Sequence, residues 1–196
     1  MRIRVALALV AAAMLSACGI NSVPTAEENA KARWADVQAA YQRRANLIPN
    51  IVSTVKGAAA SEDKILTDVQ NARSRATSIQ VSAADLSDPA KVQQYQAAQT
   101  ALGGSLGRLL ATAENYPDLK SQARFGDLVN ELEGTENRIN IAIRDYNTAV
   151  QGYNTRIRTF PDAIGAKIFY GAKPMVPFQA QPGAETAPTV SFGNGS

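Results

Sequence analysis

The chain has 196 residues, 45% of them hydrophobic, and contains no histidine and one cysteine. The absence of histidine excludes Ser-His-Asp and Cys-His catalysis, zinc sites that need histidine, and the Glu-x-x-His ligands of di-iron bundles. The formal net charge is +3, but two of the 20 basic residues belong to the leader, which leaves 18 against 17 acidic residues. A nearly neutral chain has no net positive electrostatic potential to attract phosphate groups, so nucleic acid is not an expected partner.

The first 17 residues have the layout of a secretory signal peptide. Arg2 and Arg4 precede an apolar run, Val5 to Leu15, that is too short to span a bilayer. The sequence around Cys18, Leu-Ser-Ala-Cys, resembles a bacterial lipoprotein processing site, where the thiol is acylated and the signal is cut. An ordinary signal peptide that ends near a free thiol is the alternative.

Lipidation of Cys18 predicts a protein held in the bacterial envelope and facing the periplasm, with residues 18–24 as a tether. Membrane lipid is then its first partner. Gly19 follows the cysteine where an aspartate would indicate inner-membrane retention, so the outer membrane is favoured over the inner one.

A first long helix is predicted from Thr25 to about Ala60. Thr25 and Glu28 have the spacing of a capping box. Pro49 lies inside the helix and is expected to kink it rather than break it. The predicted buried face repeats every seven residues at Trp34, Tyr41, Ile48 and Val55.

A second helix is predicted to start at a Ser61 cap, and a third at Asp88-Pro89 after a connector, residues 81–87. The buried face of the second consists of Ile65, Val69, Ala72, Ala76 and Ile79, and that of the third of Val92, Tyr95, Leu102, Leu106, Leu109, Ala113 and Tyr116. Gly103, Gly104 and Gly107 are expected to let a neighbouring backbone approach closely, and a small-ligand or peptide site near them is one functional alternative.

A last helix is predicted from about Ser121 to Thr159, with an apolar seam every seven residues: Leu132, Ile139, Tyr146, Tyr153 and Phe160. Glu136 alone interrupts this seam. We interpret it mainly as part of a polar layer, with Arg44 as its partner, that fixes the register of the bundle. A contact with a ligand or a partner is the alternative.

The pairs Tyr146-Asn147 and Tyr153-Asn154 repeat seven residues apart. The tyrosines are interpreted as core residues with hydroxyls at the rim. A conditional alternative is a docking stripe formed by Asn147, Asn154, Arg156 and Arg158. Arginines in a last helical turn also complement the helix dipole without any partner.

Residues 163–178 are apolar and aromatic and are expected to fold back onto the helices, whereas residues 179–196 have a composition typical of disorder. The predicted fold class is all-α, an elongated antiparallel bundle of about four helices over residues 25–178. No catalytic, cofactor-binding or metal-ligating residues are predicted.

Several long blocks of the chain closely resemble the LemA family of bacterial envelope proteins. They are Ala40-YQRRANLIPNIVSTVKG-Ala58, LGRLLATAENYPDLK ending at Lys120, FGDLVNELEGTENRI, YNTAVQGYNTRIRTFP, and the segment from Ala172 to Phe178. The resemblance covers about residues 26–178. It implies an elongated antiparallel helical bundle that faces away from the cytoplasm and supplies no catalytic residues.

Many relatives have an N-terminal membrane helix. A lipid anchor in this chain would differ from that pattern: it would change how the protein is attached, but the protein would still lie on the same side of the membrane. Relatives occur beside TPM-domain membrane proteins and a membrane protease, which implies such envelope proteins as partners. The expected function is a non-enzymatic adaptor or assembly scaffold for membrane proteins, with a purely structural envelope role as an alternative. The oligomeric state and the identity of the partner stay open.

Overall fold

The computed structural model describes residues 21–58 and 62–179. The predicted signal peptide, Cys18, the Ser61 cap and residues 180–196 of the predicted tail lie outside the described residues. In the described part every regular element is helical: α2 (Ser22–Ala58), α3 (Asp63–Ser78), the 3₁₀ turn η2 (Ala83–Ser87), α4 (Pro89–Ala113), α5 (Pro117–Lys120), α6 (Ala123–Arg156), α7 (Asp162–Gly165) and the π-helical turn η3 (Ala166–Tyr170).

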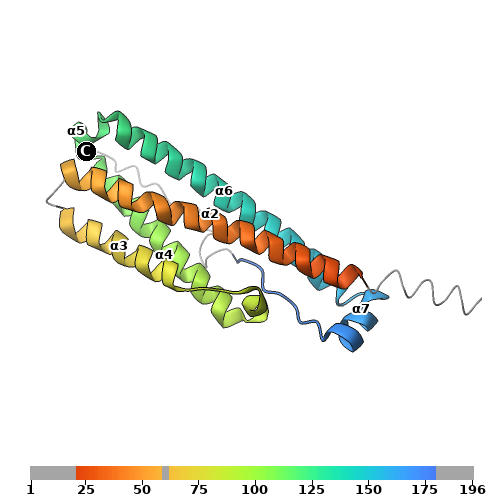
Figure 1. The fold of residues 1–196 in the computed structure, drawn as a ribbon. Helices are drawn as coiled ribbons and strands as arrows, with labels where there is room; N and C mark the ends of the chain where they lie inside the picture. Colours follow the sequence, from red (N-terminus) through yellow and green to blue (C-terminus); the bar gives the residue numbers. More distant parts are fainter. Residues whose placement is uncertain (1–20, 59–61, 180–196) are drawn as a thin grey trace, which may run out of the picture.

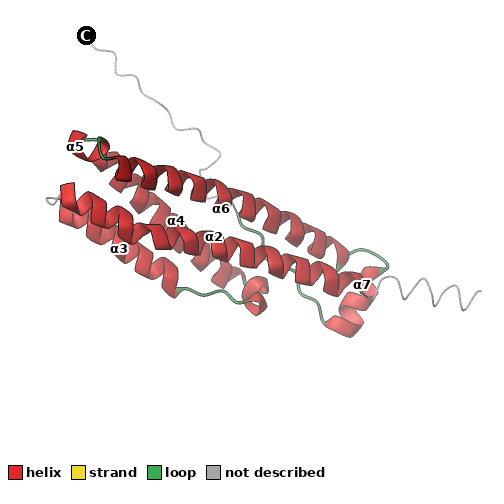
Figure 2. Ribbon diagram, turned by 45° about the horizontal axis from the view of Figure 1, so that its top comes forward, coloured by secondary structure: helices red, strands yellow, loops and turns green. Residues whose placement is uncertain are grey.

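Four of these helices form an elongated antiparallel bundle (Figure 1). The two longest, α2 and α6, lie side by side along its whole length, and α3 and α4 pack on each other beneath them (Figure 2). Helix α3 has only 16 residues, so it covers one half of α2, which has 37. The prediction of an all-α bundle is therefore confirmed.

Helix α2 begins at Ser22, so the predicted capping box at Thr25 and a tether that reaches Pro24 are wrong. Proline in a first helical turn lacks only an amide that would have no partner there, and the helix can start before it. Thr25 is already inside the helix, where its hydroxyl donates to the carbonyl of Asn21 at 2.7 Å. Glu28 pairs with Lys31 instead of closing a cap.

Pro49 lies within α2 without ending it. A proline removes the amide that would bond to the carbonyl four residues earlier, which is that of Ala45. Arg73 of α3 replaces this donor, because its Nε donates to the Ala45 carbonyl at 2.8 Å. The half-buried Arg73 side chain thus lets the long helix continue through its proline.

Asp88 caps α4 as predicted, since its carboxylate accepts from the amides of Ala90 and Lys91. The predicted buried face of α3 began at Ile65, but in the structure Leu66 is buried and Ile65 is only half-buried.

The expectation of a close backbone approach at the α4 glycines is wrong. An added Cβ at Gly103 or Gly104 would meet only the tip of an arginine side chain, at 3.6 and 3.9 Å, and at Gly107 it would meet nothing within 4 Å.

Helix α6 starts at Ala123 and ends at Arg156, close to its predicted limits. The seam holds as far as Tyr153, because Leu132, Ile139, Tyr146 and Tyr153 are all buried. Phe160 does not continue it and is 82% exposed. The chain turns after Arg156 toward Pro161, so a seven-residue repeat no longer places that side chain on the buried face.

The core consists of two clusters. We call the first the aliphatic half; it is made by α3, α5, the second part of α2 and α4 and the first part of α6. Its buried side chains include Leu47, Ile48, Ile51, Leu102, Leu109, Leu119, Phe125 and Leu132. We call the second the aromatic half; it contains Trp34, Tyr41, Tyr95, Tyr146 and Tyr153. There α3 is absent, and residues 81–87 and 171–178 cover the helices instead (Figure 1).

Candidate functional site

A buried polar layer lies where the two halves of the core meet. Arg44 of α2 is 3% exposed, and its Nη1 donates to Oε1 of Glu136 on α6 at 3.1 Å. Its Nη2 donates to Gln99 of α4, to the backbone carbonyl at 2.8 Å and to Oε1 at 2.9 Å. Gln99 in turn donates from Nε2 to the carbonyl of Ala76 on α3 at 3.2 Å. The layer therefore connects all four long helices.

The structure brings the two residues of the predicted polar layer, Arg44 and Glu136, together. Their environments differ, because the Arg44 side chain is 4% exposed and the Glu136 side chain 42% exposed. The guanidinium carbon of Arg44 also lies 4.9 Å from the ring centre of Tyr41, which is within cation–π range. Its Nε has no hydrogen-bond partner within the described residues. This geometry is that of a buried polar layer within the bundle, with Glu136 at its solvent-exposed edge.

A second polar arrangement joins α6 to the C-terminal segment, residues 171–178, which we call the strap. The side-chain amide of Asn154 binds one strap residue, Met175: Nδ2 donates to its carbonyl at 2.8 Å, and Oδ1 accepts from its amide at 2.9 Å. Asn147 binds Phe178 in the same way, at 3.0 and 2.8 Å. Each asparagine thus pairs with a backbone residue as a neighbouring β-strand would.

The spacing of the two asparagines matches the strap. Seven helical residues rise about 10 Å, and the three residue-to-residue steps from Met175 to Phe178 span a similar length, about 10 Å, in extended backbone. Between the two contacts the Tyr146 hydroxyl donates to the carbonyl of Val176 at 2.9 Å, and the Val176 amide donates to the carbonyl of Leu86 in η2 at 2.8 Å. Tyr146, Asn147 and Asn154 therefore hold a strap that runs antiparallel to α6 and supply hydrogen-bond partners to its backbone.

Beneath the strap lies a cluster of aromatic rings centred on Trp34. Its ring lies 5.3 Å from those of Tyr95 and Tyr146, and 5.7 Å from that of the strap residue Phe178. The Trp34 indole nitrogen donates to the carbonyl of Val81 at 2.9 Å, which fixes the connector before η2. Burial raises the pKa of Tyr41 to about 12, and it raises the pKa of Tyr95 and of Tyr146 as well.

The four residues of the predicted docking stripe do not form one surface. Asn147, Asn154 and Arg158 line a shallow groove of about 300 Å³ beside Pro177. The amides of both asparagines hold the strap, so they are occupied by the protein itself. Arg156 instead lines a different groove, between α6 and α2, and its Nη1 lies 3.4 Å from Oδ2 of Asp162.

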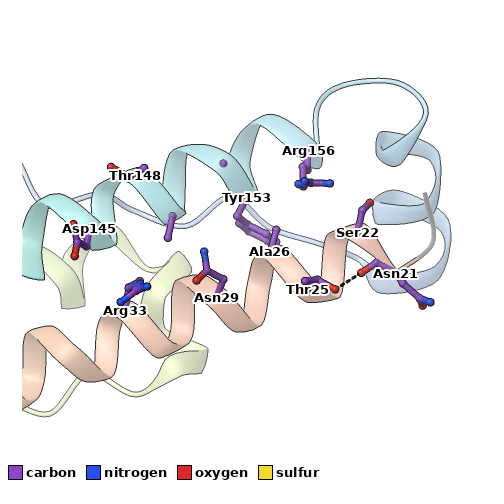
Figure 3. A pocket seen from close by; sticks show the side chains of 12 residues that line it. Asn21, Ser22, Thr25, Ala26, Asn29, Arg33, Asp145, Thr148, Tyr153 and Arg156 are labelled. Atoms are coloured by element: carbon purple, nitrogen blue, oxygen red, sulfur yellow. Dashed lines mark hydrogen bonds between the residues drawn. The ribbon is translucent and has the colours of Figure 1, made fainter. Parts of the chain in front are cut away.

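The groove between α2 and α6, which we call the end groove, has a volume of about 860 Å³ (Figure 3). It lies where α2 begins and α6 ends. Its walls are mostly polar and carry two arginines: Asn21, Ser22, Thr25, Asn29, Arg33, Asp145, Thr148 and Arg156, with Ala26, Ala149, Gly152 and Tyr153. Since Asp145 brings the opposite charge to the two arginines, the end groove suits a polar partner segment with mixed charges.

No reactive constellation is visible in the part of the chain that the structure describes. Within residues 21–58 and 62–179, no three His, Cys, Asp or Glu side chains are placed to hold a metal ion. Across the same residues, no helix combines the length and the apolar character that a membrane crossing requires.

Sequence reasoning missed two parts of these sites. Gln99 lies seven residues after Val92 and seven before Leu106, so it is a polar residue on the apolar repeat of α4. That interruption could have identified Gln99 as a member of the polar layer. The partners of Asn147 and Asn154 are backbone groups 21 to 31 residues later. Helical periodicity carries no information about such contacts.

Comparison with known proteins places these features in a family. Residues 33–192 match the model of the LemA family. Two curated relatives of Paramagnetospirillum magneticum, magnetosome proteins MamQ 2 and MamQ 1, are each 28% identical over 182 residues. Magnetosome protein MamQ of Magnetospirillum gryphiswaldense is 26% identical over the same length. In each case the alignment covers 85% of this chain and 66% of the relative, so the chain spans slightly less than two thirds of these proteins. The family match includes the polar layer, the strap and most of the end groove, and the chain belongs to the LemA family.

Proposed function

We propose that this protein is a lipid-anchored envelope protein that acts without catalysis, as an adaptor or assembly scaffold for membrane proteins. Acylated Cys18 would attach it to a membrane on the periplasmic side, with the outer membrane favoured. The names of the matched relatives associate those proteins with the magnetosome and state no reaction. Family membership and the lipoprotein-like leader support a place at a membrane.

The end groove is the observation that carries an adaptor role. Polar groups in the two other sites bind the chain itself, in the polar layer and in the strap contacts. The end groove instead is open and lined by hydroxyl, amide and charged side chains. It lies at the end of the bundle where α2 begins (Figure 1). Cys18 comes only four residues before Ser22 in the sequence, so an anchor there would bring a membrane protein within reach of the groove.

The partner is expected to be an envelope membrane protein, with a TPM-domain protein or a membrane protease as the candidates that the family resemblance implies. A segment close to the membrane in that partner would lie between Arg33 and Arg156. Arg33 donates to Asp36 at 3.2 Å and Arg156 to Asp162 at 3.4 Å. These hydrogen bonds orient both guanidinium groups on the rim of the groove.

The anchor is tested by fractionation of cells that express the full chain. Cys18→Ser should release the protein from the membrane fraction or leave its leader uncut. Unchanged processing and unchanged membrane fractionation would refute lipidation.

The docking role is tested by crosslinking in intact cells, followed by a pull-down of the full chain. Arg33→Glu/Arg156→Glu reverses the charge of the end groove, and Arg75→Glu/Arg108→Glu makes the same change on the distant face of α3 and α4. One membrane partner that is lost only in the first variant would support the adaptor. No reproducible partner with the wild type would contradict it and favour a purely structural role.

A binding module for a small ligand or peptide remains the alternative. A groove of about 740 Å³ between α3 and α4 is lined by Gly104, Ser105 and Arg108 among others, next to the predicted location. The seam beside it is filled, because Leu102, Leu106 and Leu109 are buried. A rise in melting temperature with a periplasmic metabolite extract, abolished by Arg108→Glu, would favour this function over the adaptor.

A further inference from the structure

One short segment carries nearly all the exposed large hydrophobic side chains of the described residues. Five of six lie between Phe160 and Tyr170: Phe160 is 82% exposed, Ile164 52%, Ile168 68%, Phe169 66% and Tyr170 41%. The sixth, Ile141, lies alone on α6 and is 40% exposed. Single exposed hydrophobic residues are common on soluble proteins, whereas a cluster of this size marks an interaction surface.

The fold holds this segment in a fixed orientation. Its inward residues, Gly165 and Ala166, are both buried, and Ala166 belongs to the aromatic half of the core. The Ala172 amide donates to the Ala166 carbonyl at 3.0 Å, which ties the segment to the start of the strap. Because the small residues face inward, the large apolar residues remain outside. The expected folding back of residues 163–178 thus holds for the strap and for Gly165 and Ala166, whereas the large apolar residues between positions 164 and 170 remain exposed.

The position of the segment indicates what covers it. Helix α7 and turn η3 lie at the end of the bundle where α2 begins, as Figures 1 and 2 show. Asn21, the first described residue, comes three residues after Cys18. Three residues span at most about 11 Å, so an anchor on Cys18 would hold this end of the bundle close to the bilayer.

The charges around the segment agree with a lipid surface. Four basic residues lie between positions 156 and 173: Arg156, Arg158, Lys167 and Lys173. The one acidic residue in this stretch, Asp162, is paired with Arg156. Exposed aromatic and aliphatic side chains beside basic ones are typical of segments that lie in the interface of an anionic bilayer.

We propose that residues 160–170 form a membrane-contact surface, with Phe160, Ile168 and Phe169 in the interfacial region of the bilayer that carries the anchor. This inference rests on the proposed lipid attachment and adds to it an orientation: the α7 end faces the membrane and the bundle stands away from it. The basic side chains of Arg158, Lys167 and Lys173 contact anionic lipid headgroups.

The test uses the full chain, expressed with its leader, purified and reconstituted into vesicles of phosphatidylethanolamine and phosphatidylglycerol. Phe169→Trp places an indole on the proposed surface, and Ile141→Trp places one at the exposed position on α6. The wild type, whose only tryptophan is the buried Trp34, gives the background. Lipids with brominated acyl chains quench only those indoles that reach the bilayer interior.

Brominated lipid should lower the tryptophan fluorescence that Phe169→Trp adds to the wild-type background by at least about twofold. It should leave the fluorescence that Ile141→Trp adds unchanged. An indole at position 169 that is quenched by aqueous iodide and not by brominated lipid would overturn the proposal. Quenching by neither reagent would also overturn it, since a protein surface would then cover the segment. Flotation of the wild type with the vesicles reports the anchor separately, so loss of attachment is distinguishable from loss of the contact.

Discussion

Each half of the bundle has its own buried cluster, and the two clusters are covered in different ways. In the aliphatic half, four helices surround a cluster that consists mainly of leucine, isoleucine, valine and alanine side chains, with Phe125 among them. In the aromatic half, α3 is missing, and irregular backbone from η2 and the strap covers a cluster of one tryptophan and four tyrosines. The polar layer of Arg44, Gln99 and Glu136 separates them.

This difference shows what an extended covering segment requires. A helix satisfies its own backbone groups, whereas an extended segment with no neighbouring strand needs partners from elsewhere. In the aromatic half these partners are helix side chains: Trp34 and Gln38 bind the Val81 carbonyl, and Tyr146, Asn147 and Asn154 bind the strap. Large aromatic residues then fill the space that a fourth helix occupies in the other half.

The largest expected effect comes from removing the strap contacts. Asn147→Ala/Asn154→Ala deletes four hydrogen bonds to Met175 and Phe178, which should cost about 3–4 kcal/mol of unfolding free energy. Urea denaturation measures this loss, and near-ultraviolet circular dichroism should show weaker aromatic signals. Asn140→Ala, an exposed asparagine on the same helix, is the matched control. Equal stability of the two variants would mean that the strap does not stabilise the aromatic half.

The next effect concerns the boundary between the halves. Glu136→Ala leaves the buried Arg44 charge without its counterion and should cost about 2–3 kcal/mol, somewhat less than a fully buried pair because Glu136 is partly solvated. Arg44→Met in the same background should restore part of that loss. The exposed pair Arg33 and Asp36 is the control, and its removal should change stability by less than about 1 kcal/mol. If Arg44→Met made the first variant still less stable, the layer would act through more than charge.

A smaller effect is expected in the aliphatic half. Arg73→Met removes the donor to the Ala45 carbonyl and should cost about 1–2 kcal/mol. The same change in a Pro49→Ala background should cost much less, because the helix then supplies its own amide to that carbonyl. Thermal unfolding of the four proteins in this cycle gives the coupling energy. A coupling near zero would show that Arg73 does not compensate for the proline.

The smallest effect at neutral pH belongs to the tyrosines. Burial raises the pKa of Tyr41 from 10.0 to about 12, and it raises that of Tyr95 and Tyr146. The unfolded chain therefore loses these protons first, so stability is fully present below about pH 10 and falls as pH rises through the folded-state pKa values. Urea midpoints measured between pH 8 and 12 should be constant and then decline, with Tyr41→Phe reducing the decline. A midpoint that falls already below pH 9 would point to other groups.

Much of the fold follows from periodicity. The apolar repeat identified α6, and the turn before it and Pro161 after it placed its ends within three residues. The interruption at Glu136 suggested Arg44 as a partner, and the two side chains are in contact. The repeat and its interruption depend only on which residues share a helical face. Phe160 shows the limit of this reasoning, because the repeat continues in the sequence after the helix has ended at Arg156.

The strap could not be derived in the same way. Asn147 and Asn154 lie on the flank of α6, and their spacing suits either an external partner or a backbone segment of the same chain. Only the fold shows that residues 175–178 return to this face, since their backbone, not their side-chain pattern, makes the contacts. The end groove likewise arises from two helix ends about 120 residues apart, and no local motif marks it.

Native-state hydrogen exchange of the full protein, resolved by residue, tests the difference between the two halves most directly. The amides of Met175, Val176 and Phe178 should be strongly protected in the wild type. In Asn147→Ala/Asn154→Ala the amides of Met175 and Phe178 should lose protection together with the aromatic half, while α3 keeps its protection. Unprotected strap amides in the wild type, or equal loss of protection in both halves, would contradict it.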